Sequence, residues 1–529
     1  MQHLTPLYKR TPYETLPALL IDAVRRFGDQ AAFRWDDPAA DEQCFRYRDL
    51  GSMAASLAAH FAACGRRREH IAILGRNTPQ WVAAWFAAVT SDNVAVPLDK
   101  GLPEGELADS LRRGRCTVLV YERRYAGMLA SVRRHGPLPV TEWICMDEIT
   151  PEAGSDDGTD ILQQLPAPAP QDPAVLLFTS GTTSRSKAVL LSHRNLCSNV
   201  YAYTSCTRLH PQDTVLAILP FHHTFGAMAG MLSVIACGAC SVFHPGLRYI
   251  RRALSRWQVT IFMSVPLLIE KLCSSIKKEL AEEASQTPRA ALGGSLHMVV
   301  CGASPFDPET ARWLQAAGIL PAQVYGLTEA SPALTIETER EHRIGSVGKP
   351  VPGVDLAIDR PNAQGIGEII ASGPNIMLGY YEDPHATAAA LAGGWFHTGD
   401  LGSIDADGYL YLHGRIKNVI VLKSGKNVYP EELEALVQQL PYVEECLVSG
   451  VPRRGKDTSD PVLSLRLVYD PACREARLSA DAFRALAEAD IDRLNRQLPS
   501  YKKIQRLVLT DQPLERTGTK KIKRTACYL

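Results

Sequence analysis

Residues 176–189 read LLFTSGTTSRSKAV, an apolar run followed by a loop of glycine and small hydroxyl residues and then by one lysine. The run Val175–Phe178 predicts a buried strand. Gly181 permits close approach of a ligand to the backbone, and Lys187 adds a mobile positive charge. The hydroxyl residues that could donate to phosphate oxygens, together with their amides, are Thr179, Ser180, Thr182 and Thr183. The segment indicates a phosphate-binding loop, with a plain polar surface loop as an equal alternative, and it lacks the Walker pattern.

On either side of this loop, short apolar runs alternate with helical patterns. Ile71–Leu74 predicts a buried strand, and Asn77-Thr78-Pro79 predicts a helix start before the apolar run Trp81–Val89. The other strands predicted in this region are Val94–Leu98, Thr117–Tyr121, Val215–Leu219, Val259–Met263, His297–Cys301 and Gln323–Tyr325. Strands that alternate with helices predict parallel sheets covered by helices.

The pattern changes near residue 350. Val354–Ile358, Gly367–Ala371 and Tyr409–His413 predict short strands between turn residues, and a compact α+β pattern follows Arg415. Its elements are a strand at Val419–Leu422, a helix from Pro430, strands at Cys446–Ser449 and Val462–Leu467, and a helix at Ala480–Gln497. We predict an α/β protein. Its large N-terminal domain, residues 1–414, has helix-covered mixed and parallel sheets and a β-barrel-like portion, and its small, mobile C-terminal α+β domain is residues 415–529.

The composition is that of a globular protein, with 46% hydrophobic and 22% charged residues in a chain of 529. Lys+Arg and Asp+Glu are both 57, so there is no basic excess, and we expect no nucleic-acid partner. The N-terminal residues do not resemble a signal peptide, and no apolar run is long enough for a transmembrane helix. The 13 cysteines are scattered, as expected of free thiols in the cytoplasm. Cys237 and Cys240 have redox-motif spacing, but without a second pair we expect neither zinc nor redox chemistry there.

Two further segments carry candidate ligand-binding residues. In Val324–Ala330, Tyr325 could stack on a base and Glu329 could hold Mg²⁺ beside phosphates. The alternative is a strand-to-helix junction capped by Thr328. Asp400 follows a glycine and suits a carboxylate that grips ribose hydroxyls, with a plain turn residue as the alternative.

These segments occur in the order found in the adenylate-forming (ANL) superfamily. Over nearly its whole length the chain resembles the acyl-CoA synthetases, peptide-synthetase adenylation domains and firefly luciferase of that group. The motifs that carry the resemblance are Thr179–Lys187, Phe221–Gly226, Gly302–Ser304, Tyr325–Glu329, Thr398–Asp400, Gly414–Lys417 and Arg516–Lys521.

The resemblance implies a site for ATP. In it, Asp400 and Arg415 hold the ribose, while Gly302–Ser304 and Tyr325 frame the adenine. The full nucleotide-binding set is Thr179, Ser180, Gly181, Thr183, Lys187, Gly302, Ala303, Ser304, Tyr325, Gly326, Thr328, Asp400 and Arg415.

The resemblance also implies catalytic roles. Thr182 and Glu329 lie near the phosphates and Mg²⁺. Lys521 reaches the α-phosphate during adenylation. Lys417 is the hinge between the two domains.

The pair His222-His223 does not indicate a metal site, because adjacent residues rarely chelate one ion and no further His or Cys cluster is evident. By the resemblance, His223, Phe225 and Gly226 belong to the acyl pocket. A structural core histidine is the alternative for His223.

The chain departs from the family pattern in places. Ser184 and Ala188 stand where glycine is usual, and Ser186 stands where proline is usual. Lys520 replaces a frequent glycine, and Asn418 replaces a frequent acid. The lost glycines put the mobility of the phosphate loop in doubt.

The function implied is that of an ATP-dependent acid:thiol ligase, which forms an acyl-AMP with release of pyrophosphate and then transfers the acyl group to a thiol. Its cofactors are ATP, Mg²⁺ and coenzyme A, or the phosphopantetheine of a separate acyl carrier protein. Phe221–Gly226 and the Arg516–Arg524 tail resemble those of fatty-acyl-CoA synthetases, so we expect a fatty acid, with an aryl acid next. The alternatives are a luciferase-type oxygenase and a non-catalytic acyl or nucleotide sensor.

Overall fold

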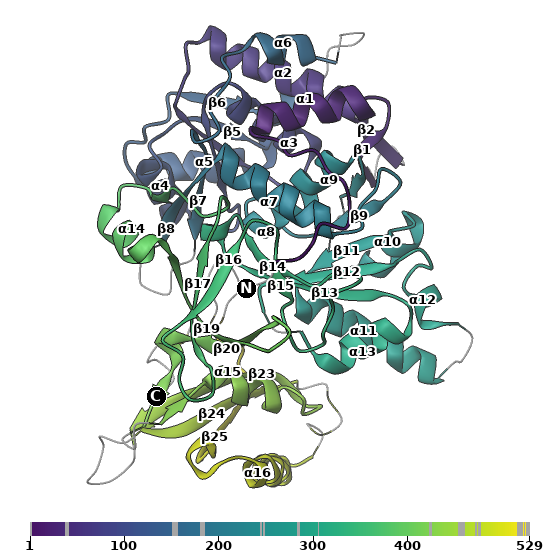
Figure 1. Cartoon of the computed structure of the whole chain (residues 1–529), viewed down its shortest axis with the longest axis vertical. Helices are drawn as coiled ribbons and strands as arrows, with labels where there is room; N and C mark the ends of the chain where they lie inside the picture. Colours follow the sequence, from purple (N-terminus) through teal and green to yellow (C-terminus); the bar gives the residue numbers. More distant parts are fainter. Residues whose placement is uncertain are drawn as a thin grey trace. The chain divides into compact units, whose positions relative to one another are not determined.

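The computed structural model describes residues 3–36, 42–150, 157–179, 186–243, 246, 249–282, 286–304, 306–422, 426–452, 461–470, 473, 475, 478–515, 522 and 524 (Figure 1). The chain forms two compact units. The first unit comprises Met1–Ala357, Ile370–His397 and Asp405–Leu410, and the second comprises Ile358–Ile369, Thr398–Ile404 and Tyr411–Leu529. Because neither unit is one continuous segment, a domain boundary at residue 414 stays a prediction.

The first unit contains a seven-stranded sheet. In spatial order its strands are β18 (Gly379–Tyr380), β8 (Lys187–Ser192), β7 (Pro173–Thr179), β4 (Val94–Leu98), β3 (His70–Leu74), β5 (Cys116–Tyr121) and β6 (Glu142–Cys145). The strands from β7 to β6 are parallel, whereas β8 is antiparallel to both β7 and β18. The parallel strands are short apolar runs, as expected for strands covered on both faces.

The first unit also contains a nine-stranded sheet. Its order is β15 (Lys349–Pro350), β14 (Ala333–Ile336), β13 (Leu320–Gly326), β12 (Met298–Gly302), β11 (Ile261–Ser264), β9 (Thr214–Ala217), β10 (Cys240–Val242), β1 (Ala31–Asp36) and β2 (Glu42–Arg46). The central strands from β13 to β1 are parallel, and the outer pairs at both edges are antiparallel. Both sheets are therefore mixed, with parallel centres.

Helices cover the faces of these sheets, as Figure 1 shows. They are α1 (Leu16–Phe27), α2 (Tyr47–Ala63), α3 (Pro79–Thr90), α4 (Glu104–Arg113), α5 (Ala126–Val132), α6 (Thr159–Gln164), α7 (His193–Cys206), α8 (Thr224–Ala227), α9 (Ser233–Cys237), α10 (Ile250–Arg256), α11 (Pro266–Glu282), α12 (Pro288–Ala291), α13 (Pro308–Ala316) and α14 (Pro384–Ala390). Every residue of α3 except Gln80 is buried, which suits a helix that is apolar all round. The helix begins at Pro79, as the sequence predicted, and the side chain of Thr78 caps it by accepting from the amide of Trp81 at 3.2 Å.

Strands after residue 350 form a four-stranded sheet in the order β16 (Asp355–Asp359), β17 (Gly367–Ser372), β19 (Phe396–Ile404) and β20 (Leu410–Arg415). In the second unit, β21 (Ile420–Val421) pairs with β22 (Asn427–Val428), and β23 (Val443–Pro452), β24 (Pro461–Tyr469) and β25 (Arg506–Thr510) form a sheet. Apolar residues of α15 (Pro430–Val437) and α16 (Ala480–Gln497) pack into one core with this three-stranded sheet. The α+β prediction for this region is confirmed.

Most strand boundaries lie within two residues of their predictions. One of these small shifts has a clear cause: β9 ends at Ala217, before the predicted Leu219. The carbonyl of Leu219 accepts instead from the side chain of Asn77 at 2.8 Å, so the chain has left the sheet.

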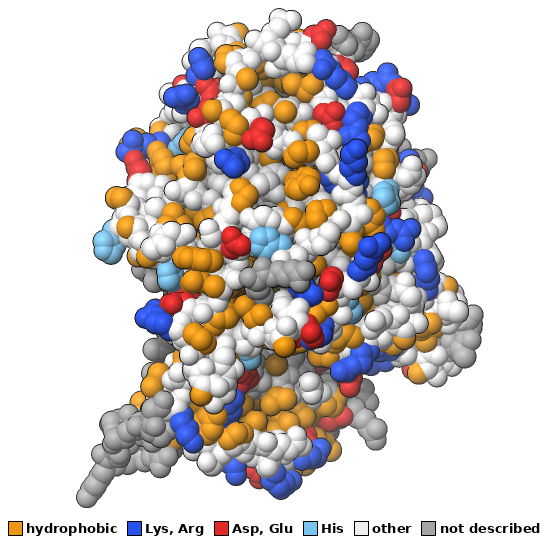
Figure 2. Space-filling model, in the orientation of Figure 1, with side chains coloured by type: hydrophobic (Ala, Val, Ile, Leu, Met, Phe, Trp, Pro, Cys, Tyr) orange, Lys and Arg blue, Asp and Glu red, His pale blue; other side chains and the backbone are white. Residues whose placement is uncertain are grey.

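None of the helices in the described part of the chain combines the length and apolar character that a membrane crossing requires. On the face in Figure 2, basic and acidic side chains are interspersed, in keeping with the net charge of +0.

Candidate active site

The base of the predicted phosphate loop is the open end of an antiparallel hairpin. Thr179 ends β7 and lies opposite Lys187, the first residue of β8. The Thr179 hydroxyl donates to the Lys187 carbonyl at 3.3 Å. The predicted ligands Ser180, Gly181, Thr182 and Thr183, and the substituted Ser184, lie outside the described residues. The hairpin places the lysine beside the threonine at one end of the sheet.

A line of three side chains starts from Lys187. Its Nζ atom lies 4.2 Å from the centre of the Tyr380 ring, and the Tyr380 hydroxyl donates to Oε1 of Glu329 at 3.0 Å. Tyr380 is on β18, next to β8, and Glu329 is in the 3₁₀ helix η6 (Thr328–Ala330). Burial raises the pKa of the tyrosine, and Glu329 raises it further, so the hydroxyl keeps its proton and remains a donor. The structure thus brings a cation and a carboxylate together on one aromatic side chain.

Two buried asparagines hold the backbone on either side of this line. The Nδ2 atom of Asn375 donates to the carbonyl of Ala330, the residue after the carboxylate, at 2.9 Å. Asn195, on α7, donates to the carbonyl of Ile376 at 2.8 Å. Because these amides satisfy backbone carbonyls that have no strand partner, they fix an irregular segment in one conformation.

Arg113 holds the far end of the loop. Its Nη1 donates to the hydroxyl of Ser186 at 3.0 Å and its Nη2 to the carbonyl of the same residue at 2.5 Å. The guanidinium also lies 5.3 Å from the centre of the Phe178 ring, on the opposite strand of the hairpin. Ser186 stands where proline is usual in the family that the chain resembles. Proline has no hydroxyl, so it could not accept the hydrogen bond that Arg113 donates to the Ser186 side chain.

The predicted adenine frame lies at the end of β12. Gly302 is buried, whereas Ala303 and Ser304 are exposed. Ala303 has φ +74°, a backbone conformation that costs a non-glycine residue energy and is often found at functional sites. A Cβ on Gly302 would lie 2.8 Å from the carbonyl oxygen of Val324, on the neighbouring strand β13, so the close approach of these strands requires glycine.

The strand β13 carries the other predicted adenine contact. Tyr325 is 6% exposed, so most of its ring is already covered by protein. Gly326 follows, and a Cβ there would lie 1.8 Å from the carbonyl oxygen of Pro332. Thr328 accepts a hydrogen bond from the hydroxyl of Thr224 at 3.1 Å, so its side chain is tied to α8. The Thr328 hydroxyl does not cap a helix here, because η6 has no side-chain cap.

The predicted acyl-pocket residues lie on and before α8. His223 precedes the helix, and a Cβ on Gly226 would lie 2.3 Å from the carbonyl oxygen of Pro220, so only glycine fits. The ring of Phe225 lies beside Gly302, with 3.5 Å between its Cε1 and the Cβ position of that glycine. A π-helix, η4 (Met228–Leu232), continues α8, and such irregular turns are frequent at functional sites. The acyl-pocket segment and the adenine frame are therefore neighbours.

His222 is the buried member of the histidine pair. Burial, and then the neighbouring His223 and Lys100, hold the pKa of His222 well below its ordinary value. Its Nε2 lies 3.4 Å from Oδ1 of Asp99. The described residues near these rings include no third side chain arranged with them for a metal. The expectation that this pair does not bind a metal stays a prediction.

The predicted ribose pair lies in the second unit. The Nε atom of Arg415 lies 2.8 Å from Oδ1 of Asp400. Asp400 is only 7% exposed, and its amide donates to the hydroxyl of Thr398 at 3.1 Å. The amide of Gly399 donates to Glu368 at 2.9 Å, which fixes the turn that presents the carboxylate. The structure brings these two predicted residues into direct contact.

The predicted hinge residue Lys417 lies in the 3₁₀ helix η8 (Ile416–Asn418). Asn418, which replaces an acid frequent in the family, donates to Oε1 of Glu431 at 2.6 Å. The predicted catalytic Lys521 and its neighbour Lys520 lie outside the described residues.

Magnesium would be held at Glu329. Its Oε1 accepts from Tyr380, and among the described residues no hydrogen-bond donor reaches Oε2. A partly buried carboxylate with a free oxygen beside a phosphate loop suits a hard cation, which prefers oxygen ligands. The residue type and its position therefore fit the expected ion.

Sequence reasoning missed Tyr380 and Arg113. Both act on the loop from elements far away along the chain, and only the strand order β18–β8–β7 brings Tyr380 beside Lys187. The signal available in the sequence was a Gly-Tyr pair after an apolar run, which is weak by itself.

The buried Cys237 and Cys240 are free thiols, and burial raises their pKa to about 11 and about 12, so neither forms the thiolate that redox chemistry needs.

Comparison with known proteins finds two family profiles that together cover most of the chain. The profile of the AMP-binding enzyme family matches residues 20–381, and that of the AMP-binding enzyme C-terminal domain matches residues 417–529. A feruloyl-CoA synthase of Amycolatopsis sp is 30% identical over 489 residues, covering 90% of this chain and 92% of that protein. An indoleacetate–CoA ligase of Aromatoleum aromaticum is 29% identical, covering 77% of this chain and 81% of its own. The solved anthranilate CoA ligase AuaEII, in complex with anthranoyl-AMP, has a TM-score of 0.80 at 21% identity, covering 97% of this chain and 96% of that chain.

Proposed function

Because the chain belongs to the family of AMP-binding enzymes, we propose that it is an ATP-dependent acid–CoA ligase. It joins a carboxylate to AMP with release of pyrophosphate, and then passes the acyl group to the thiol of coenzyme A. The observation that carries the proposal is the line Lys187–Tyr380–Glu329 at the base of the loop. It gathers a cation and a carboxylate where the phosphates of ATP and their Mg²⁺ would lie.

The chemistry explains why such residues are needed. An oxygen of the acid attacks the α-phosphorus, a bond to the bridging oxygen breaks, and pyrophosphate leaves with the electron pair. Both reactants are anionic, so positive groups must offset their repulsion and the charge that develops in the transition state. Lys187 and Lys521 supply such charge, and one well-placed donor can contribute roughly 3–4 kcal/mol. Bound Mg²⁺ would neutralise phosphate charge further.

We propose an acid with a large apolar acyl group. The Phe221–Gly226 motif and the Arg516–Arg524 tail favour a fatty acid. An aryl acid is the second candidate, because the relatives named above act on feruloyl and indoleacetate groups. The phosphopantetheine of a separate carrier protein is the alternative acceptor.

Pyrophosphate release tests the proposal. The full chain is incubated with ATP, Mg²⁺ and a panel of fatty and aryl acids, with and without coenzyme A. We expect acid-dependent release, and a thioester product only when coenzyme A is present. ATP binding without release for any acid would instead indicate a sensor, and light on addition of luciferin would indicate an oxygenase.

The variant Lys521→Ala separates the two half-reactions. We expect adenylation to slow by about 10²-fold or more, the scale of losing one transition-state charge partner. Synthetic acyl-AMP should largely restore thioester formation. Unchanged adenylation would remove Lys521 from the catalytic set and leave the ligase assignment to the pyrophosphate assay.

A further inference from the structure

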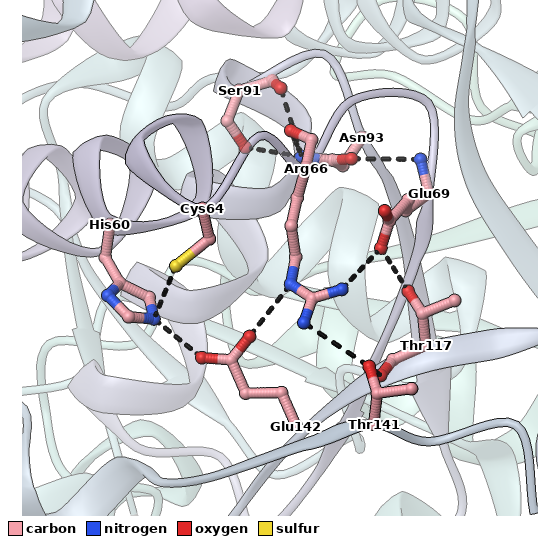
Figure 3. Close-up of polar contacts among 9 residues, drawn as sticks. All are labelled: His60, Cys64, Arg66, Glu69, Ser91, Asn93, Thr117, Thr141 and Glu142. Carbon is pink, nitrogen blue, oxygen red and sulfur yellow. Dashed lines mark hydrogen bonds and ion pairs between the residues drawn. The ribbon is translucent and has the colours of Figure 1, made fainter.

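Three metal-ligating side chains meet where the end of α2 faces the edge strand β6 (Figure 3). His60 is in the last turn of α2, Cys64 directly follows the helix, and Glu142 is the first residue of β6. The Nε2 atom of His60 lies 2.7 Å from Oε1 of Glu142 and 3.9 Å from Sγ of Cys64. The three ligand atoms all lie within 4.8 Å of one another. None of these residues belongs to the active site described above.

We propose that His60, Cys64 and Glu142 bind a zinc-like divalent cation, with water as the fourth ligand. In a tetrahedral zinc site with bonds of about 2.0 Å to nitrogen and oxygen and about 2.3 Å to sulfur, ligand atoms are roughly 3.3–3.6 Å apart. The observed distance between His60 and Cys64 is close to this range. The shorter distance between His60 and Glu142 is a hydrogen bond, which opens by about 0.6 Å when the cation replaces the shared proton.

The donor set selects the class of cation. Imidazole nitrogen, thiolate sulfur and carboxylate oxygen together suit Zn²⁺ or Co²⁺. Mg²⁺ and Ca²⁺ prefer sites made only of oxygen atoms. Because Cys64 follows His60 by four residues at the end of α2, the two side chains lie on the same face of the helix.

Glu142 is already oriented for this role. Its other oxygen, Oε2, accepts from Nε of Arg66 at 2.8 Å, which leaves Oε1 directed at His60 (Figure 3). Arg66 is held in turn by Glu69 at 2.9 Å and by the hydroxyl of Thr141 at 3.3 Å. Such supporting contacts fix ligand geometry in known metal sites. The carboxylate of Glu69 also offsets the charge of Arg66 close to the cation.

The backbone that carries Arg66 is fixed as well. Asn93 donates to the carbonyl of Arg66 at 3.2 Å and to that of Ser91 at 3.0 Å, and it accepts from the amide of Glu69 at 2.9 Å. The loop between α2 and β3 is therefore anchored beside the three ligands (Figure 3). Although burial opposes it, hydrogen bonds from His60 and Arg66 lower the pKa of the Glu142 carboxyl.

A bound cation would tie the end of α2 to an edge strand. The competing explanation is an exposed ion pair between protonated His60 and Glu142, with Cys64 nearby by chance. The two differ in one property, because only a metal site uses the sulfur of Cys64 as a ligand.

Cobalt titration of the chelator-treated full chain tests this directly. We expect one equivalent of Co²⁺ to bind with a thiolate-to-cobalt charge-transfer absorption, and Zn²⁺, but not Mg²⁺, to abolish it. Cys64→Ser should lose the charge-transfer band, whereas Cys44→Ser, which removes another exposed thiol, should keep it. His60→Gln should weaken Co²⁺ binding by about 10-fold or more.

Far-ultraviolet circular dichroism and the melting temperature show that each variant is folded. Zn²⁺ should raise the melting temperature of the wild type and of Cys44→Ser, but not that of Cys64→Ser, because a ligand that binds only the folded state stabilises it. Absence of a stoichiometric charge-transfer band in the wild type, or its persistence in folded Cys64→Ser, would overturn the proposal.

Discussion

The ammonium nitrogen of Lys187 lies 4.2 Å from the centre of the Tyr380 ring, because their strands β8 and β18 are paired although the two residues are far apart in the sequence. The same tyrosine donates its hydroxyl to Glu329. One side chain therefore positions both a cation and a carboxylate at the base of the loop. A substitution at Tyr380 should therefore affect the positions of both Lys187 and Glu329.

Tyr380→Phe should impair adenylation without unfolding the protein. The ring that faces Lys187 remains, but Glu329 loses a donor, and a hydrogen bond to a charged group contributes roughly 1.5–3 kcal/mol. We expect kcat/KM for ATP to fall by about 10-fold or more, with a raised requirement for Mg²⁺. Tyr381→Phe is the matched control, because its hydroxyl has no contact with Glu329 in the described structure. Equal activity of the two variants would contradict a role for the Tyr380 hydroxyl.

Asp400→Asn should weaken ATP binding by roughly 1.5–3 kcal/mol, the range for losing hydrogen bonds to a charged group. The amide is neutral, pairs less well with Arg415 and offers one acceptor oxygen to the ribose hydroxyls in place of two. Calorimetric titration with ATP measures the effect. Asp407→Asn, which alters an exposed carboxylate 2.7 Å from Arg343, should leave the affinity unchanged. Unaltered binding in folded Asp400→Asn would remove this residue from the nucleotide site.

Gly326→Ala should destabilise the protein or prevent its folding. The new Cβ would lie 1.8 Å from the carbonyl oxygen of Pro332, a backbone atom that cannot turn away as a side chain does. We expect a loss of about 3 kcal/mol or more, at the upper end for overpacking. Gly127→Ala is the control, because its Cβ would meet nothing within 4 Å and it lies in α5. A melting temperature of Gly326→Ala equal to that of the control would show that the strand ends can separate at little cost.

Stability should depend on pH through His193. Burial lowers the pKa of its imidazole to about 4 from 6.5, and its Nδ1 accepts from the amide of Leu16 at 3.3 Å. In the unfolded chain the imidazole of His193 takes up a proton below about pH 6.5, whereas in the folded protein it does so only near pH 4. Stability is therefore complete above this window and is lost as the pH falls through it, by about 3 kcal/mol at most.

Denaturant unfolding at several pH values measures this dependence. His193→Asn keeps an acceptor for Leu16 but cannot titrate, so its stability should fall less steeply between pH 6.5 and pH 4. His385→Asn removes an exposed histidine and should behave as the wild type does. If His193→Asn and the wild type have the same slope, the proton is taken up elsewhere.

Lys417→Pro should separate the two half-reactions. Proline fixes φ near −65° and removes an amide donor, so it restricts the backbone rotation that a hinge requires. We expect the variant to keep one half-reaction and to lose most of the other, while Lys417→Ala keeps both. Acyl-AMP formation and thioester formation from synthetic acyl-AMP are measured separately. Full retention of both by the proline variant would show that Lys417 is not a hinge.

Much of the fold could be predicted because its signals are local. The apolar run Val94–Leu98 coincides with β4, and the pattern at Ala480–Gln497 coincides with α16. A buried parallel strand is a short apolar run wherever it occurs, and an amphipathic helix has a period that its own residues reveal.

The contacts that complete the site could not be predicted in this way. The partnership of Arg113 with Ser186 joins α4 to the end of the loop, and that of His60 with Glu142 joins a helix to an edge strand. Each depends on the order of strands in a sheet, which no short segment encodes. Asp400 and Arg415 were found from the sequence only because both belong to recognisable motifs.

In the β7–β8 hairpin, substitutions and changes of length should not be tolerated equally during evolution. Lys187 is held by its pairing with Thr179, and its strand pairs with β18 on the other side, so a substitution at an exposed position of these strands leaves both ends in place. Shifting β8 by one residue would instead turn every side chain of the strand to the opposite face. Lineages descended from this gene should therefore tolerate a substitution at an exposed position of the hairpin more readily than an insertion or deletion within β8.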